Sequence, residues 1–128
     1  LLAARAAMRG GAGLLRLLDP EGLFGLLLPL ALPEAVRVEI AGPPDAGWFG
    51  ARDEHALLIG PGLGMLDPEG LRRLVREALE GFRGPVLLDA DALNVFAGRA
   101  RELVRPRGVL VLTPHPGEAG RLLGAEVG

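Results

Sequence analysis

The sequence lacks several of the residue types that most enzymes use for chemistry. It has no cysteine, serine, lysine, glutamine or tyrosine, and it has one threonine, one asparagine and two histidines. The absence of cysteine excludes disulfides, thiolate nucleophiles and cysteine-bound metals. The absence of serine excludes a Ser-His-Asp triad, and the absence of lysine excludes a Walker A loop and a Schiff base. Chemistry is left to carboxylates, histidine, arginine, asparagine, threonine and backbone amides.

A strong excess of charge and a long hydrophobic run are also missing. The 128 residues carry a formal net charge of −2. No basic stripe is visible, so we expect no nucleic-acid partner. The longest apolar stretch, residues 23–32, contains Pro29 and is about half the length that a spanning helix needs. We therefore expect a globular chain that fits one domain and has no membrane partner.

Short apolar and β-branched runs predict strands at regular intervals. They lie at residues 14–18, 36–40, 56–59, 86–89 and 109–113. Helical patterns separate several of these runs. Strands that alternate with helices favour an α/β fold with a mostly parallel sheet flanked by helices.

The clearest helix signal follows Asp67, where apolar residues recur at positions i, i+3, i+4 and i+7. We expect Asp67 to cap this helix, Pro68 to occupy its first position, and Gly81 or Gly84 to end it. The arginines and glutamates between residues 72 and 80 are expected to form its solvated face. The segment LDPEGL occurs at both 18–23 and 66–71, which we interpret as reuse of one helix-start signal.

Other helix signals are shorter. Residues 1–9 are rich in alanine and leucine and predict a helix, and further short helices are expected after Asp91 and Gly117. Trp48 and Phe49 lie in a loop rich in glycine and proline, where we expect them to serve packing or an interface. His55 is expected to be a satisfied or exposed histidine.

Three unusual loops follow predicted strands, and ligands bind beyond the carboxyl ends of parallel strands. The first loop, GPGLG at 60–64, could bring backbone amides close to an anion, or could be a tight turn only. The second, DADALN at 89–94, offers two acids and an amide that could orient a ligand or Mg²⁺. Capping of a helix by Asp91 is the structural alternative.

The third loop, TPHPGE at 113–118, contains the only threonine and one of the two histidines. The prolines that flank His115 stiffen the backbone on both sides. Gly117 and Glu118 are expected to start a helix whose amides can receive an anion. We therefore expect His115 to contact a ligand.

Four segments in order resemble a known family: LLAARAAMRGGAGLL, ALLIGPGLG, PVLLDADALN and VLVLTPHPGEAGRLLG. Together they resemble the ADP/ATP-dependent NAD(P)H-hydrate dehydratases of the ribokinase-like superfamily. The resemblance covers most of the chain and is weakest between Asp19 and Asp53. It implies a ribokinase-like α/β fold in which residues 1–128 form part of a single domain that is incomplete at both ends.

The resemblance also implies an activity, namely nucleotide repair. ADP or ATP, with Mg²⁺, would drive dehydration of the S form of NAD(P)H hydrate to NAD(P)H, through phosphorylation of the hydrate's hydroxyl and loss of phosphate. The implied enzyme is a cytoplasmic homo-oligomer that works beside, or is fused to, an NAD(P)H-hydrate epimerase. By motif, the implied substrate site comprises Gly60, Gly62, Gly64, Asp89, Asp91, Asn94, His115, Pro116, Gly117, Glu118 and Arg121.

The chain departs from the family pattern at both ends. An upstream glycine/alanine segment, a downstream Lys-Gly segment and a Gly-x-Gly-Asp motif have no counterpart in these residues. In the family the last two hold the adenine nucleotide and supply the catalytic aspartate, so we expect no catalytic residue here. The isolated 128 residues are therefore expected to be inactive, and measurable turnover of NADH hydrate would contradict this.

Other functions stay open from the sequence. One alternative is a ribokinase-like kinase of a small alcohol, such as a sugar, a thiazole or a pyrimidine. Another is a non-catalytic α/β binding module, favoured by the missing nucleotide-binding motifs. A dinucleotide oxidoreductase is disfavoured because no GxGxxG motif follows the first predicted strand.

Overall fold

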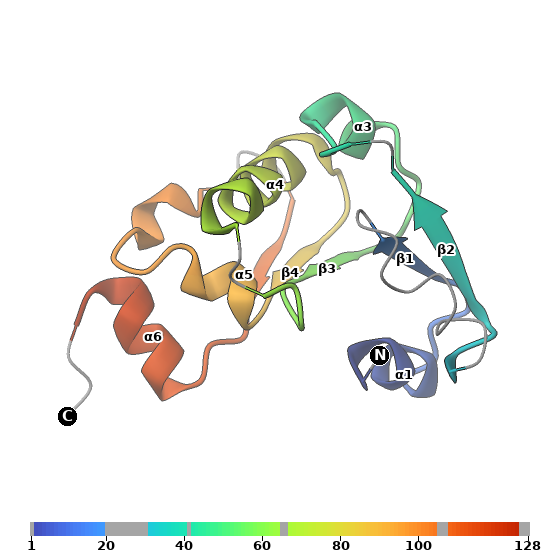
Figure 1. Ribbon diagram of the computed structural model, residues 1–128, viewed down its shortest axis with the longest axis horizontal. Helices are drawn as coiled ribbons and strands as arrows, with labels where there is room; N and C mark the ends of the chain where they lie inside the picture. Colours follow the sequence, from blue (N-terminus) through green and yellow to red (C-terminus); the bar gives the residue numbers. More distant parts are fainter. Residues whose placement is uncertain (1, 20–30, 41, 65–66, 105–107, 126–128) are drawn as a thin grey trace. The chain divides into compact units, whose positions relative to one another are not determined.

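The computed structural model describes residues 2–19, 31–40, 42–64, 67–104 and 108–125 (Figure 1). The chain divides into two compact units, Leu1–Pro43 and Pro44–Gly128. Helices accompany parallel strands in both units, which confirms the predicted α/β class. The strands pair in two separate sheets within the described residues, each sheet belonging to one unit.

The first unit contains helix α1 (Leu2–Arg9) and the parallel strands β1 (Leu15–Asp19) and β2 (Ala35–Glu39). Its small core joins Ala4 and Leu32 to apolar side chains of both strands. The predicted strands 14–18 and 36–40 are confirmed within one residue. The first LDPEGL copy falls mostly on residues 20–23, outside the described residues.

The second unit is built on a three-stranded parallel sheet in the order β3–β4–β5. Its strands are β3 (Leu57–Ile59), β4 (Val86–Leu88) and β5 (Leu110–Leu112). The amides of Asp89 and Thr113 continue the ladder by donating to the carbonyls of Ile59 and Leu88. The predicted strands at 56–59, 86–89 and 109–113 are therefore confirmed to within one or two residues.

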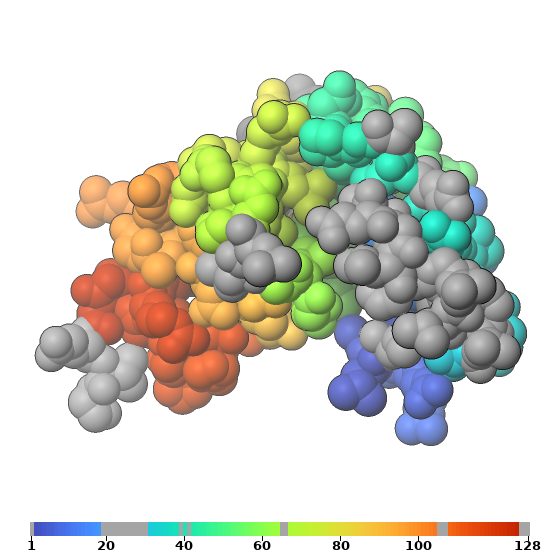
Figure 2. Space-filling view, viewed as in Figure 1, coloured from blue at the N-terminus to red at the C-terminus, as the bar shows by residue number. Residues whose placement is uncertain are grey.

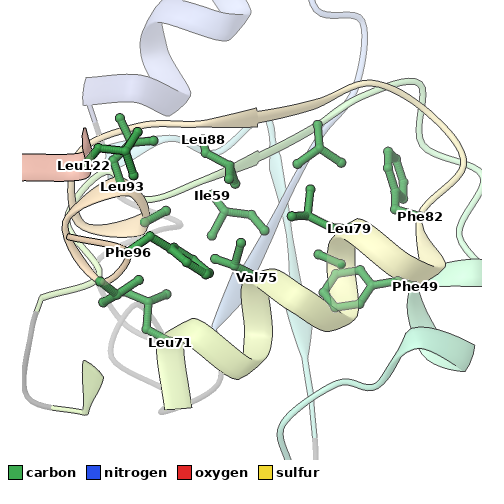
Figure 3. Packing of buried hydrophobic residues seen from close by; sticks show 14 residues of the cluster. Phe49, Ile59, Leu71, Val75, Leu79, Phe82, Leu88, Leu93, Phe96 and Leu122 are labelled. Atoms are coloured by element: carbon green, nitrogen blue, oxygen red, sulfur yellow. The ribbon is translucent and has the colours of Figure 1, made fainter. Parts of the chain in front are cut away.

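Helix α4 (Pro68–Gly81) packs its apolar side onto this sheet. Figure 3 shows Val75 and Leu79 directed toward Ile59 and Leu88 of the strands. Asp67 caps the helix by accepting from the Gly70 amide, and Pro68 is its first residue, as predicted. The 3.6-residue period thus identifies the helix and the face that it buries.

The expected solvated face of α4 is only partly solvated. Arg73, Arg76 and Glu80 are exposed. Arg72 is largely buried, and its Nε donates to the carbonyl of Val95. Glu77 accepts from the amide of Ala46. Both side chains are long enough to reach polar backbone groups of neighbouring segments, which periodicity does not reveal.

The prediction of a loop around Trp48 is wrong, because residues Ala46–Gly50 form helix α3. Asp45 caps it by accepting from the Trp48 amide, and Glu77 of α4 binds its first amide. Phe49 is buried in the core and Trp48 packs against it, so the expected packing role is confirmed. A five-residue helix rich in glycine gives no periodic signal, and contacts with α4 hold it in place.

Three short elements complete the second unit: α5 (Asp91–Asn94), a 3₁₀ turn η1 (Ala100–Glu102) and α6 (Pro116–Leu123). Helices α5 and α6 contact each other, and Figure 2 shows the red surface of α6 against the orange surface that follows β4. The predicted short helices after Asp91 and near Gly117 are confirmed. No helix in the described ranges is long and apolar enough to cross a membrane.

Candidate functional site

The three loops singled out from the sequence meet at one edge of the β3–β4–β5 sheet. Ile59, Leu88 and Leu112 are aligned in the parallel register and are the last residues of their strands. The loops that follow them therefore leave the sheet at the same level and on the same side. The structure thus brings the GPGLG, DADALN and TPHPGE segments together at the carboxyl ends of the strands.

The second and third loops are joined by the side chain of Thr113. Its hydroxyl donates to Asp89 Oδ1 at 2.9 Å. No other residue of the sequence carries a hydroxyl side chain. The one hydroxyl of this chain is therefore used to tie the end of β5 to the end of β4.

The first and second loops are joined by Asp91. Its Oδ2 accepts from the Gly64 amide at 2.8 Å. The expectation that Asp91 caps a helix is wrong, because Ala90 occupies the cap position and Asp91 is the first residue of α5. The carboxylate reaches across to the glycine loop, a contact between segments 27 residues apart that local sequence rules cannot predict.

Gly60 is needed where the first loop passes the end of β4. A side-chain Cβ at this position would lie 1.7 Å from the Asp89 carbonyl oxygen, and the φ angle is +133°. Gly62 and Gly64 also have positive φ, but open space surrounds their Cβ positions. The glycines thus serve two purposes: Gly60 allows close approach, and the other two allow the turn.

His115 is the N-cap residue of α6. Its Nδ1 accepts from the Gly117 amide at 3.1 Å, and the His115 amide donates to Glu118 Oε2 at 3.0 Å, which completes a capping box. Because Nδ1 accepts, the neutral ring carries its proton on Nε2. Nε2 lies 3.6 Å from Glu118 Oε1 on a side chain that is 62% exposed. At that distance Nε2 is not hydrogen-bonded to Glu118, and on the exposed ring it can donate to a ligand.

The capping box changes one expectation about this helix. The amide of Gly117 is already bound by His115, and the Ala119 amide donates to the His115 carbonyl. These groups are not free to receive an anion at the start of α6, which begins at Pro116. Glu118 is the buried acid of the box.

Arg121 lies one turn further along α6 and contacts the second loop. Its Nε donates to Asn94 Oδ1 at 3.2 Å. Among the described residues, Arg121 makes no ion pair and its terminal nitrogens have no hydrogen-bond partner, and the side chain is exposed. Its Nη1 lies 3.6 Å from the Cβ position of Gly117, which places a positive charge beside the His115 loop.

Sequence reasoning gave Thr113 and Ala90 no place in the site. Thr113 is the only threonine of the chain and belongs to the third loop, but its partner Asp89 lies 24 residues away and gave no sequence signal. Ala90 has φ +49° and ψ −117°, and it is the one non-glycine residue with positive φ in the described part of the chain. Alanine gives no sequence signal for such a conformation.

His55, the second histidine, is exposed and precedes β3, at the end of the strand opposite the three loops. Among the described residues, no group of three or more His, Cys, Asp or Glu side chains could hold a metal ion. The local chemistry is that of hydrogen bonding: carboxylates at positions 89, 91 and 118, an imidazole, a guanidinium and glycine amides.

Comparison with known proteins gives a consistent result. A family model described as NAD(P)H-hydrate dehydratase matches residues 1–128. The chain is 40% identical over 131 residues to the bifunctional NAD(P)H-hydrate repair enzyme Nnr of Moorella thermoacetica. The aligned region covers 96% of this chain and 24% of that protein. It is 40% identical over 128 residues to Nnr of Escherichia coli, covering 98% of this chain and 22% of that protein.

A shorter relative is the ADP-dependent (S)-NAD(P)H-hydrate dehydratase of Bacillus subtilis. It is 37% identical over 133 residues, covering 99% of this chain and 43% of that protein. The chain therefore spans less than half the length of each of these three relatives.

Proposed function

Because this chain belongs to the NAD(P)H-hydrate dehydratase family, we propose that it carries part of the substrate site of an enzyme that repairs NAD(P)H hydrate. The whole protein would use ADP or ATP to dehydrate the S form of the hydrate to NAD(P)H. Residues 1–128 would contribute one part of a single ribokinase-like domain. The observation that carries this proposal is the meeting of the three motif loops at one sheet edge.

Each loop offers a different kind of contact to a dinucleotide. The glycine loop lets the substrate approach the backbone closely, since Gly62 and Gly64 have open space around them. His115 offers the Nε2 proton, and Arg121 offers two terminal nitrogens to a phosphate. Asp89, Asp91 and Asn94 hold the loops in place through the bonds described above. Pro116, Gly117 and Glu118 form the rigid cap that fixes the imidazole.

The proposed reaction has two steps. The hydroxyl oxygen of the hydrate takes the terminal phosphoryl group of the nucleotide and loses its proton. The carbon–oxygen bond then breaks, phosphate leaves, and loss of a proton from the neighbouring carbon restores the double bond of the dihydronicotinamide. No residue of this chain is assigned as the base, and we propose that the catalytic group lies in another part of the whole protein.

We propose that the reaction uses Mg²⁺, but that residues 1–128 do not form a binding site for the free ion. The described residues offer no cluster of three metal-ligating acids or histidines. Mg²⁺ is commonly held by one or two carboxylates together with substrate phosphates. We therefore propose that the ion arrives on the phosphates of ADP or ATP.

The decisive experiment incubates the full-length protein with S-NADH hydrate or S-NADPH hydrate and either ADP or ATP. We expect the absorbance of reduced nicotinamide to return only when hydrate and nucleotide are both present. Comparison of the four combinations then identifies the preferred nucleotide and hydrate. Absence of this conversion, together with phosphorylation of a sugar, thiazole or pyrimidine alcohol, would favour a small-alcohol kinase.

The proposed enzyme also has an expected oligomeric state, cellular location and partner enzyme. We propose a homo-oligomer in the cytoplasm, where its substrate arises from the cell's own reduced cofactors. An epimerase that interconverts the two hydrate forms would be fused to the protein or act beside it. Two relatives are named bifunctional repair enzymes, which supports a second, fused activity such as the epimerase.

A further inference from the structure

The tripeptide Asp89–Ala90–Asp91 has an unusual arrangement at the centre of the three loops. Its two carboxylates bind in opposite directions along the sheet edge. Asp89 binds the hydroxyl of Thr113 after β5, and Asp91 binds the amide of Gly64 after β3. One short segment after the middle strand therefore connects to both neighbouring loops.

The backbone between the two acids is strained. Ala90 has φ +49° and ψ −117°, a region that residues with a Cβ rarely adopt. The surrounding structure holds it there from both sides. The Asp89 amide donates to Ile59, while Ala92 and Leu93 directly after Asp91 are buried in the core.

The close approach of Gly60 adds a third constraint. The Asp89 carbonyl occupies the space that a Cβ of Gly60 would need, so the first loop is packed directly against the strained turn. A change in the direction of the Asp89 peptide would therefore disturb the glycine loop even without a side-chain contact.

We propose that Asp89–Ala90–Asp91 is a clamp that sets the spacing of the three loops, with Thr113 as a positioning residue for substrate binding. The clamp couples Thr113 to the glycine loop, although the hydroxyl touches only the β4 end. Its role in substrate binding rests on the proposed function. The coupling itself is a property of the free protein and can be measured without substrate.

The first test measures amide hydrogen exchange at Gly64 in the full-length protein without ligand. Thr113→Val removes the hydroxyl and keeps the branched shape, and we expect it to accelerate exchange at Gly64 about tenfold, as loss of one bond to a carboxylate would. Thr113→Ser retains the hydroxyl and should restore slow exchange. Unchanged exchange in Thr113→Val would show that the two bonds are independent and would overturn the clamp.

The second test examines the strained backbone. Ala90→Gly fits the positive φ, so exchange at Gly64 should stay within about threefold of the parent protein. Ala90→Val cannot adopt this conformation without further strain and should accelerate exchange at both Gly64 and Asp89. If Ala90→Val folds with slow exchange at both positions, the strained turn is not the origin of the coupling. If Ala90→Val fails to fold, the comparison of Thr113→Val with Thr113→Ser still tests whether Thr113 is coupled to the glycine loop.

The third test connects the clamp to function. Thr113→Val should raise the KM for NAD(P)H hydrate about tenfold with a much smaller change in kcat, and Thr113→Ser should restore the KM. An unchanged KM beside accelerated exchange would retain the coupling and reject its role in binding. If the parent protein does not convert the hydrate at all, the proposed function is wrong. The exchange measurements then still show whether Asp89–Ala90–Asp91 couples Thr113 to the glycine loop.

Discussion

His115 has two separable tasks, one for each ring nitrogen. Nδ1 caps α6 through the Gly117 amide, and Nε2 lies 3.6 Å from Glu118 Oε1 on a side chain that is 62% exposed. Replacement by alanine would remove both, so a loss of activity in that variant alone could come from a damaged helix. A replacement that keeps the cap is needed to assign the ligand contact.

His115→Asn supplies that replacement, since asparagine is a favourable N-cap residue. We expect His115→Ala to lower the free energy of unfolding by about 1 kcal/mol and to raise the KM for NADH hydrate. His115→Asn should keep most of the stability and still show the raised KM. If His115→Asn has the KM of the parent protein, the histidine serves as a cap only, and our assignment of a ligand contact is wrong.

Arg121 is expected to bind a phosphate of the substrate, because Asn94 holds Nε while the terminal nitrogens have no partner among the described residues. Arg121→Ala should raise the KM for NAD(P)H hydrate by about ten- to a hundredfold, the worth of one bond between charged groups. Arg73→Ala, which removes an exposed arginine of α4, is the matched control and should have no effect. Added salt should raise the KM of the parent protein more than that of Arg121→Ala; equal responses would contradict this role.

The packing of α3 on α4 depends on a missing side chain. A Cβ on Gly81 would lie 2.0 Å from the carbonyl oxygen of Ala46, whereas a Cβ on Gly50 would stay 3.4 Å from the carbonyl oxygen of Gly81. Gly81→Ala should therefore push the two helices apart and destabilise the protein by about 1–3 kcal/mol. Gly50→Ala changes the same interface without the overlap. Thermal unfolding should separate the two variants, and equal melting temperatures would refute the close contact.

The ion pair between α4 and η1 predicts a dependence of stability on pH. The hydrogen bond from Arg76, 2.5 Å long, lowers the pKa of Glu102, and the charges of Arg76, Arg99 and Arg72 act in the same direction. A carboxyl whose pKa is lower in the folded state stabilises the fold above its unfolded pKa. This contribution is lost as the pH falls through the folded value.

Urea unfolding of the parent protein and Glu102→Gln at several pH values tests this. The parent protein should be slightly more stable at neutral pH, and the difference should disappear in acid and shrink in high salt, because the pair is exposed. A difference that persists at a pH below the folded pKa of Glu102 would argue against the ion pair as its source.

Periodicity was sufficient for the elements whose signal is local. Alternation and the 3.6-residue repeat predict the strands and α4, including the cap at Asp67. Helix α3 escaped prediction because its stability comes from Glu77 and from the close approach of Gly81, which are contacts between distant segments. Asp91 was misassigned for the same reason, since its partner Gly64 belongs to another loop. The meeting of the three loops at one sheet edge was predictable from the parallel strands, whereas the hydrogen bonds between the loops were not.

The chain provides one wall of a proposed site and spans 22–43% of the length of the relatives from Moorella thermoacetica, Escherichia coli and Bacillus subtilis. If Mg²⁺ binds through the nucleotide, chelation should abolish turnover by the full-length protein. Asp91→Asn should leave the Mg²⁺ concentration for half-maximal activity unchanged. A strong increase of that concentration in Asp91→Asn would instead place the ion on this segment.

Helix α3 also gives the chain a spectroscopic property. Trp48 is the only tryptophan, tyrosine is absent, and the indole meets Phe49 edge-on at 5.1 Å with the Arg52 guanidinium 4.4 Å above its ring. Tryptophan fluorescence from these 128 residues therefore originates at one place, beside the contact between α3 and α4. The intensity and wavelength of this emission report the opening of the contact between α3 and α4. Tryptophan emission and amide exchange at Gly64 would therefore follow the unfolding of two different parts of the same unit.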